Sequence, residues 1–107
     1  MAWLLRQGEV LAILEVGPSG RLRRLAGHRV PPVGAVLVPR RHAHSFGARR
    51  ALDVAYLDAD LVVVATCRLA PNRVGLPRRG VSSILEAEAG AFERWGLCRG
   101  DHLEIEE

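Results

Sequence analysis

The chain has 107 residues, 49% of them hydrophobic, and a formal net charge of +3. This length and composition exclude a disordered chain and predict a single domain, residues 1–107, that buries an apolar core without needing disulfides or metal. Every basic side chain apart from four histidines is arginine, and acidic residues are interspersed among them. This arginine-rich but modest basic excess favours weak attraction to anions and does not mark a nucleic-acid binder.

Residues 1–17 contain apolar stretches, but Arg6, Gln7, Gly8 and Glu9 interrupt them. The segment lacks the continuous apolar core and the small-residue cleavage site of a signal peptide. No apolar run is long enough to span a bilayer. We therefore expect a cytoplasmic protein without membrane attachment.

The first half of the chain predicts two strands and one short helix. Glu9–Val16 is an apolar run that ends at a Gly-Pro-Ser-Gly turn, which is typical of a buried strand. Residues 20–26 fit a short helix capped by Ser19. Residues 35–38 form a second predicted strand, and residues 43–46 are expected to be extended.

The second half begins with a predicted β-hairpin. Residues 51–57 and 61–69 are β-prone runs, and Asp58-Ala59-Asp60 forms the turn between them. Residues 70–80 are rich in Pro, Gly and Arg, which predicts a surface loop. Residues 81–87 are the next predicted strand.

The last elements are a second helix and a final strand. Residues 90–97 fit a short helix with Phe92 and Trp95 three apart on one face, and residues 102–106 form an edge-like strand. Because strands dominate and the helices are short, the sequence predicts an α+β fold: a compact, mostly antiparallel, barrel-like β domain with two short helices.

Two histidines and an aspartate form the first candidate site. His42 and His44 are two residues apart, so in a strand both point to the same side. Asp53 would complete a set of two histidines and one carboxylate, which is a known metal-ligand combination. The sequence offers no evident third nitrogen or thiolate ligand, however. His42 and His44 are thus weak metal candidates, exposed or hydrogen-bonded histidines are favoured, and no metal or other cofactor is predicted.

Asp53 lies in the apolar run ALDVAYL, where a carboxylate is costly to bury without partners. One interpretation is an internal tie between this strand and the HAHSF segment. The other is a general base or a ligand acceptor in a pocket. We favour the structural role because a lone aspartate has many such uses.

Arginine pairs bracket the histidines. Arg40, Arg41, Arg49 and Arg50 carry forked donors that match carboxylate and phosphate geometry, so a cleft for a small anion or an acidic partner is one interpretation. A solvated surface is the other, and the Arg78-Arg79 pair has the same two interpretations.

Cys67 and Cys98 lie far apart and form no C-x-x-C motif. A single disulfide between them is conceivable. Two small buried thiols are the favoured prediction.

Three blocks of the sequence resemble a known family. They are GAVLVPRRHAHSFGARRALDVAYLD, LAPNR and SILEAEAGAFERWGLCRGD, in this order. Together they are similar to the motifs of the domain of unknown function 192, with a family-like core of about residues 22–106. The biochemical role of that family is not established, and its members are often exported, whereas this chain has no evident signal.

The resemblance identifies individual residues of this chain that match the family's motifs, in several separate segments. The matching positions are Gly34, Pro39, His44, Phe46, Gly47, Asp53, Leu57, Asp58, Pro71, Arg73, Leu85, Glu86, Gly90, Gly100 and Asp101. This chain departs from the family pattern at Arg40, Ala48 and Asn72, where the family often has Cys, Met and Trp. The resemblance implies that His44, Asp53, Arg73 and Glu86 converge in one small fold, and we expect Asp53 to pair with Arg73.

The leading interpretation is a non-enzymatic module that binds a small anionic ligand or a protein partner near His44, Asp53 and Arg73. The alternative is a hydrolase-like or metal-assisted enzyme that uses His44 and Asp53 as acid, base or ligands. A weaker alternative is nucleic-acid binding through the arginine pairs. The candidate ligand-binding residues are His44, Asp53, Arg73, Glu86, Arg40 and Arg49.

Overall fold

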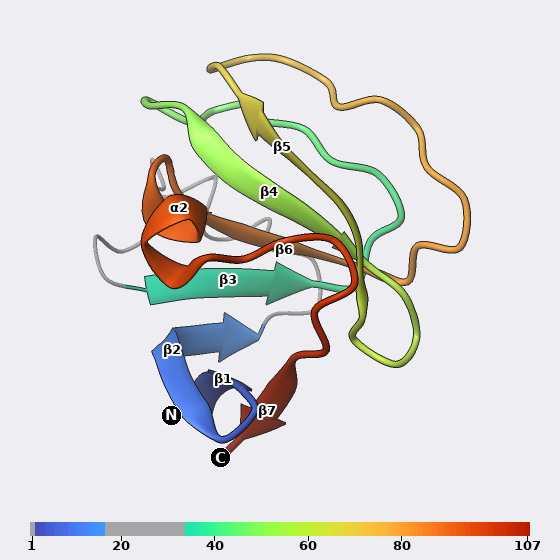
Figure 1. Ribbon diagram of the computed structural model, residues 1–107. Helices are drawn as coiled ribbons and strands as arrows, with labels where there is room; N and C mark the ends of the chain where they lie inside the picture. Colours follow the sequence, from blue (N-terminus) through green and yellow to red (C-terminus); the bar gives the residue numbers. More distant parts are fainter. Residues whose placement is uncertain (1, 17–33) are drawn as a thin grey trace.

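The computed structural model describes residues 2–16 and 34–107, and Figure 1 shows how their elements are arranged. The elements, in chain order, are β1 (Ala2–Arg6), β2 (Glu9–Val16), β3 (Gly34–Val38), β4 (Leu52–Leu57), β5 (Val63–Leu69), β6 (Ser83–Glu88), α2 (Ala91–Trp95) and β7 (Glu104–Glu106). The predicted helix at 20–26 lies outside the described residues.

All seven strands of the described chain belong to one sheet, in the order β5-β4-β6-β3-β2-β1-β7. β2 and β3 are parallel, and the other five neighbouring pairs are antiparallel, so the predicted mostly antiparallel arrangement is confirmed. The prediction of a barrel-like closure is not confirmed. The sheet is open, and its two ends approach each other near an isolated bridge between Val62, just before β5, and His102, just before β7.

Local sequence explains most of the strand boundaries. β3 and β4 are mostly apolar runs, and β6 combines apolar residues with Ser83, Glu86 and Glu88. The fold covers all three strands on both faces, so almost every residue in them is buried. The predicted β4–β5 hairpin is confirmed, and Asp58 Oδ1 accepts the N–H groups of Asp60 and Val62 at 2.8 and 3.0 Å within its turn. The sequence did not predict β1, which pairs with β2 across a two-residue turn at Gln7 and Gly8, both with positive φ.

Two apolar cores lie on the two faces of the sheet. The helix-side core carries α2, which packs against β6 (Figure 1). It consists of Ala2, Leu4, Ala12, Leu14, Ala35, Leu37, Ala55, Leu57, Val63, Leu85, Ala87, Ala91, Phe92, Leu97 and Leu103. The loop-side core lies on the other face, under the segments that join β3 to β4 and β5 to β6. It consists of Val36, Val38, Ala43, Ala48, Leu52, Val54, Tyr56, Leu69, Val81 and Ile84.

The second helix was predicted over 90–97 and is shorter, Ala91–Trp95. Gly90 and Gly96 bound it, both with positive φ, a conformation that glycine adopts at little cost. Phe92 and Trp95 were predicted to share one face of this helix, and their ring centroids lie 5.6 Å apart. In the described chain no helix is long and apolar enough to cross a membrane.

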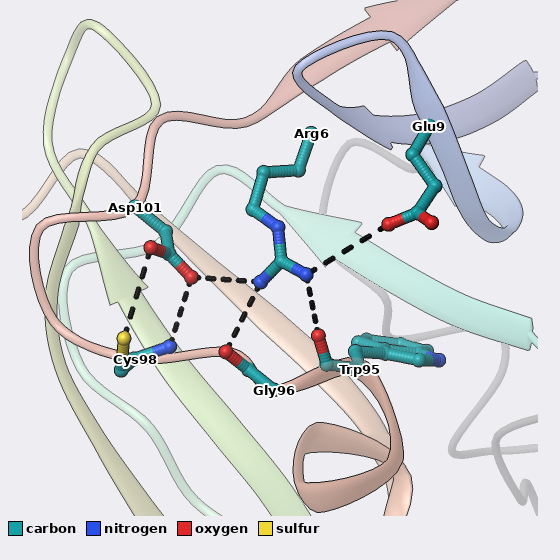
Figure 2. A network of polar contacts seen from close by, with 6 residues as sticks. All are labelled: Arg6, Glu9, Trp95, Gly96, Cys98 and Asp101. Atoms are coloured by element: carbon teal, nitrogen blue, oxygen red, sulfur yellow. Dashed lines mark hydrogen bonds and ion pairs between the residues drawn. The ribbon is translucent and has the colours of Figure 1, made fainter.

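A polar network ties the first strand to the segment before the last one (Figure 2). The Arg6 guanidinium donates to Trp95 O, to Gly96 O at 3.1 Å and to Asp101 Oδ2 at 2.9 Å. Asp101 Oδ2 also accepts the Cys98 N–H at 3.0 Å. Arg6 thus satisfies carbonyls at the end of α2 while β1 pairs with β7.

The Asp101 network predicts a pH-dependent contribution to stability. The Cys98 N–H and the Arg6 guanidinium lower the pKa of Asp101 from 3.8 against the opposing effect of burial. Because the pKa is lower in the folded chain than in the unfolded one, the contribution is complete above about pH 4 and is lost as the pH falls through the folded value. We expect Asp101→Asn to lower the free energy of unfolding by about 1–2 kcal/mol at neutral pH.

Urea unfolding of both proteins near neutral pH and near pH 3 checks this expectation. The difference between wild type and Asp101→Asn should shrink on acidification. A difference that is the same at both pH values contradicts a folded-state pKa below the unfolded one.

Candidate functional site

Asp53 is a buried anchor between β4 and α2. Its Oδ1 accepts Arg68 Nε at 3.0 Å, and its Oδ2 accepts the N–H groups of Gly90 and Phe92 at 2.9 and 3.1 Å. The carboxylate therefore satisfies backbone donors at the start of α2, which has no side-chain cap of its own. Both carboxylate oxygens of Asp53 are hydrogen-bonded within the protein, which agrees with the structural role that we favoured for this residue.

The expected pairing of Asp53 with Arg73 is wrong. Asp53 and Arg68 are directly opposite in the β4–β5 register, so Arg68 reaches the carboxylate instead. The Arg73 side chain is exposed and donates to Asn72 O at 3.3 Å. The tie predicted between Asp53 and the HAHSF segment is also wrong, because Asp53 is tied to the start of α2.

His44 is half-buried and bound to Arg40. Arg40 Nη1 lies 2.6 Å from His44 Nε2, and a guanidinium can only donate. His44 Nε2 is therefore the acceptor in this contact. The Phe46 N–H donates to Nδ1 of the same ring at 3.3 Å.

His44 and Asp53 lie over opposite faces of the sheet. Asp53 contacts Phe92 of the helix-side core, whereas His44 follows Ala43 of the loop-side core. Glu86 is buried, and its register partner on β4 is Val54, so it faces the loop side and not Asp53. The structure thus brings Arg40 and His44 together and separates Asp53 from His44 and Glu86.

Ser45 was not among the predicted site residues, and it joins the two loops of the loop side. Its Oγ is fully buried, accepts the Arg73 N–H at 2.9 Å and donates to Ala70 O. Its backbone N–H donates to Arg73 O at 2.8 Å. Asn72, at positive φ, adds a bond from the Gly47 N–H to its Oδ1 at 3.2 Å. The LAPNR and HAHSFG segments are therefore held together as one unit.

The loop side also carries an open groove of about 610 Å³, which we call the arginine groove. Its wall is formed by the β4–β5 turn, the segment 78–82 and Arg41. Its charged lining residues are Arg41, Arg78, Arg79, Asp58 and Asp60. Two Pro-Arg-Arg tripeptides, at 39–41 and 77–79, supply its cations, and this repeated tripeptide is the sequence signal that points to it.

The charged lining of the arginine groove has a small positive excess, three arginines against two aspartates. Within the described residues Arg41, Arg78 and Arg79 form no ion pair, whereas Asp58 is engaged through Oδ1 in its own turn. Arg78 also lies over the ring of the buried Tyr56, with Cζ 5.7 Å from the ring centroid, which holds one guanidinium close to the loop-side core.

The remaining candidates are dispersed. His42 and Arg49 are exposed, and the described chain contains no group of three or more His, Cys, Asp or Glu side chains that could hold a metal ion. Cys67 and Cys98 are both free. Cys67 is half-buried and burial raises the pKa of its thiol, but Cys98 is exposed, so the expectation of two buried thiols is wrong for Cys98.

Solved structures with a similar fold come from two bacteria. One is a "putative transcription regulator" from Sinorhizobium meliloti 1021, with a TM-score of 0.73 and 22% identity, covering 97% of this chain and 91% of that chain. The other is a protein of unknown function from Novosphingobium aromaticivorans DSM 12444, with a TM-score of 0.71 and 17% identity, covering 96% of this chain and 82% of that chain. At these identities the likeness shows the fold alone.

No curated protein matches the chain. A family model does match, over residues 33–105, and this range contains all three motif blocks, the Asp53 anchor and the arginine groove. The family is described as "Uncharacterized ACR". The chain therefore belongs to the domain of unknown function 192 family.

Proposed function

We propose that this protein is a non-enzymatic binding module for a small anionic ligand, such as phosphate or a small polycarboxylate, and that the arginine groove is its site. The observation that carries the proposal is the convergence of Arg41, Arg78 and Arg79 on one open groove without an ion pair to any described carboxylate. Guanidinium groups offer paired donors that match phosphate and carboxylate oxygens.

The motif residues on the loop side support the groove indirectly. Arg40 precedes Arg41 and is bound to His44, so this contact limits the freedom of the turn that carries Arg41. A site whose cations are held in place loses less conformational entropy when an anion binds. His44 and Arg40 act here as positioning residues, and Arg73, Glu86 and Arg49 have no part in the groove.

Anion titrations test the proposal. We expect phosphate, pyrophosphate or citrate to raise the melting temperature at low salt, because a ligand at 100 times its Kd stabilises the native state by about 2.7 kcal/mol. Arg41→Gln and Arg79→Gln should each weaken binding about tenfold in calorimetric titrations, since each removes a charge-assisted contact of at least 1.4 kcal/mol.

Arg49→Gln is the matched control, because Arg49 is equally exposed but lies outside the groove. Its affinity should equal that of wild type. The proposal fails if no anion stabilises the wild type, or if Arg49→Gln weakens binding as much as Arg79→Gln does.

The enzyme alternative has less support. It requires His44 and Asp53 within reach of one reacting atom, but both Asp53 oxygens are bound and the His44 Nε2 lone pair accepts from Arg40. Nucleic-acid binding through the arginine pairs stays the weaker alternative, and the cytoplasmic location and the single-domain organisation stay predictions.

A further inference from the structure

An apolar surface lies next to the arginines of the loop side. Phe46, Val74 and Leu76 are exposed by 49%, 64% and 69%, and we call them the apolar ridge. The other large apolar side chains that are exposed in the described chain, Trp3, Val10, Ile13 and Val16, all lie on β1 and β2. Single exposed apolar residues are ordinary, but neighbouring ones mark interaction surfaces.

Backbone contacts bring the ridge together. The Gly75 N–H donates to Ala43 O at 2.9 Å and the Ser45 N–H to Arg73 O at 2.8 Å, on either side of the antiparallel bridge between His44 and Val74. This pattern makes His44 and Val74 a non-hydrogen-bonded pair, whose side chains lie close together on one side. The Phe46 ring stacks on His44 with centroids 4.9 Å apart. Phe46 and Val74 therefore flank the same imidazole.

Leu76 extends this row. It lies two residues after Val74 in the same loop and is likewise exposed. The buried Ser45 hydroxyl and Asn72 hold the two loops in place beneath. The ridge is thus a preformed surface, and a partner would not have to order it on binding.

The two loops that carry the ridge have charged side chains of one sign. Residues 39–50 and 70–80 contain no Asp or Glu and seven arginines, of which Arg41, Arg78 and Arg79 line the arginine groove and Arg40, Arg49, Arg50 and Arg73 lie outside it. Arg50 has a distant contact with Glu88 at 3.9 Å, whereas Arg49 and Arg73 form no ion pair with the described residues. A surface of this kind complements a segment that carries both acidic and apolar side chains.

We infer that the apolar ridge, together with Arg49 and Arg73 of the same two loops, forms a docking surface for an acidic segment of a partner protein whose apolar side chains cover Phe46, Val74 and Leu76. This surface is separate from the arginine groove, which takes a small anion and is lined by neither Phe46 nor Val74. The apolar component distinguishes it from a site for a simple polyanion, because burial of apolar area adds affinity that salt does not screen.

Fluorescence anisotropy with short labelled peptides tests this inference. The probe is a peptide in which Glu alternates with Leu, and the comparison peptides replace every Leu by Ser or every Glu by Lys. We expect the Glu/Leu peptide to bind at least about tenfold more tightly than either. Val74→Ser and Leu76→Ser should each weaken it several-fold without lowering the melting temperature, because both side chains are largely exposed.

Val10→Ser is the matched control, an exposed valine on β2 far from the two loops in sequence, and it should leave the affinity unchanged. Arg79→Gln distinguishes the arginine groove from the apolar ridge. It should weaken phosphate binding in the groove, whereas Val74→Ser should leave phosphate binding unchanged. Equal affinity for the Glu/Leu and Glu/Ser peptides overturns the docking surface. Tighter binding of a single-stranded oligonucleotide, with an affinity that Val74→Ser does not change, also overturns it. Self-association in sedimentation that Val74→Ser abolishes overturns it too, because the ridge would then bind a second copy of this chain.

Discussion

Replacement of Asp53 by alanine is expected to lower the free energy of unfolding by about 3–5 kcal/mol, a large share of what a domain of this size has. The change leaves the N–H groups of Gly90 and Phe92 without their acceptor and leaves a void in the helix-side core. α2 has five residues and no side-chain cap of its own, so its start depends on this carboxylate. Urea unfolding followed by far-UV circular dichroism measures the loss.

Three further variants separate the parts of the Asp53 contact. Asp53→Asn keeps one acceptor oxygen, so we expect an intermediate loss of about 1–2 kcal/mol. Arg68→Ala should cost less than about 1 kcal/mol, because the Arg68 side chain is 58% exposed and its ion pair is screened by water. Arg73→Ala should have an effect within about 0.5 kcal/mol. A loss for Arg73→Ala as large as that for Asp53→Ala contradicts the observed pairing.

Gly75→Ala is the second substitution with a large expected effect. A Cβ at this position would overlap the hydroxyl oxygen of Tyr56 and come within 3.3 Å of Ala43 Cβ. Tyr56 is fully buried in the loop-side core, so its ring has no room to retreat. We expect Gly75→Ala to cost about 2–3 kcal/mol, measured by urea unfolding.

In a double-mutant cycle, Tyr56→Phe should relieve the steric overlap that Gly75→Ala creates. The Tyr56 hydroxyl is buried, and its contact with the Cys67 thiol does not have hydrogen-bond geometry, so its removal alone should change stability by less than about 1 kcal/mol. In the Tyr56→Phe background Gly75→Ala should cost only about 1 kcal/mol, which gives a coupling energy of about 1–2 kcal/mol. Leu76→Ala, an exposed neighbour, should be neutral. Additive costs of the two changes would contradict the steric explanation.

The strands that the sequence predicted are those whose own side chains determine them. β3 and β4 are mostly apolar, β2 and β6 are apolar residues interrupted by glutamates, and Asp58 accepts backbone N–H groups of the β4–β5 turn. β1 was missed because AWLLR is short and becomes a strand through its pairing with β2 and β7. The shape of the sheet depends on register between strands far apart in sequence, and this is why the open sheet was mistaken for a barrel.

The candidate site, like the fold, could be predicted only in part from the sequence. The apolar setting of Asp53 correctly indicated that a buried carboxylate needs partners, but the register of β4 against β5 decides that the partner is Arg68. The two Pro-Arg-Arg tripeptides are visible in the sequence, yet only the fold brings Arg41 beside Arg78 and Arg79. Ser45 carries no sequence signal of its buried role, because a serine in a polar loop is ordinary.

The pairing of β1 with β7 has a consequence for the order of folding. Trp3 lies opposite Glu106 in this pairing, so the contact joins residues almost a whole chain length apart (Figure 1). Contacts between distant residues form slowly, because the intervening chain must first be ordered. During synthesis on the ribosome, the outer edge of β1 therefore stays unpaired until β7 has been synthesised. Over that interval the outer edge of β1 is open to pairing with another chain.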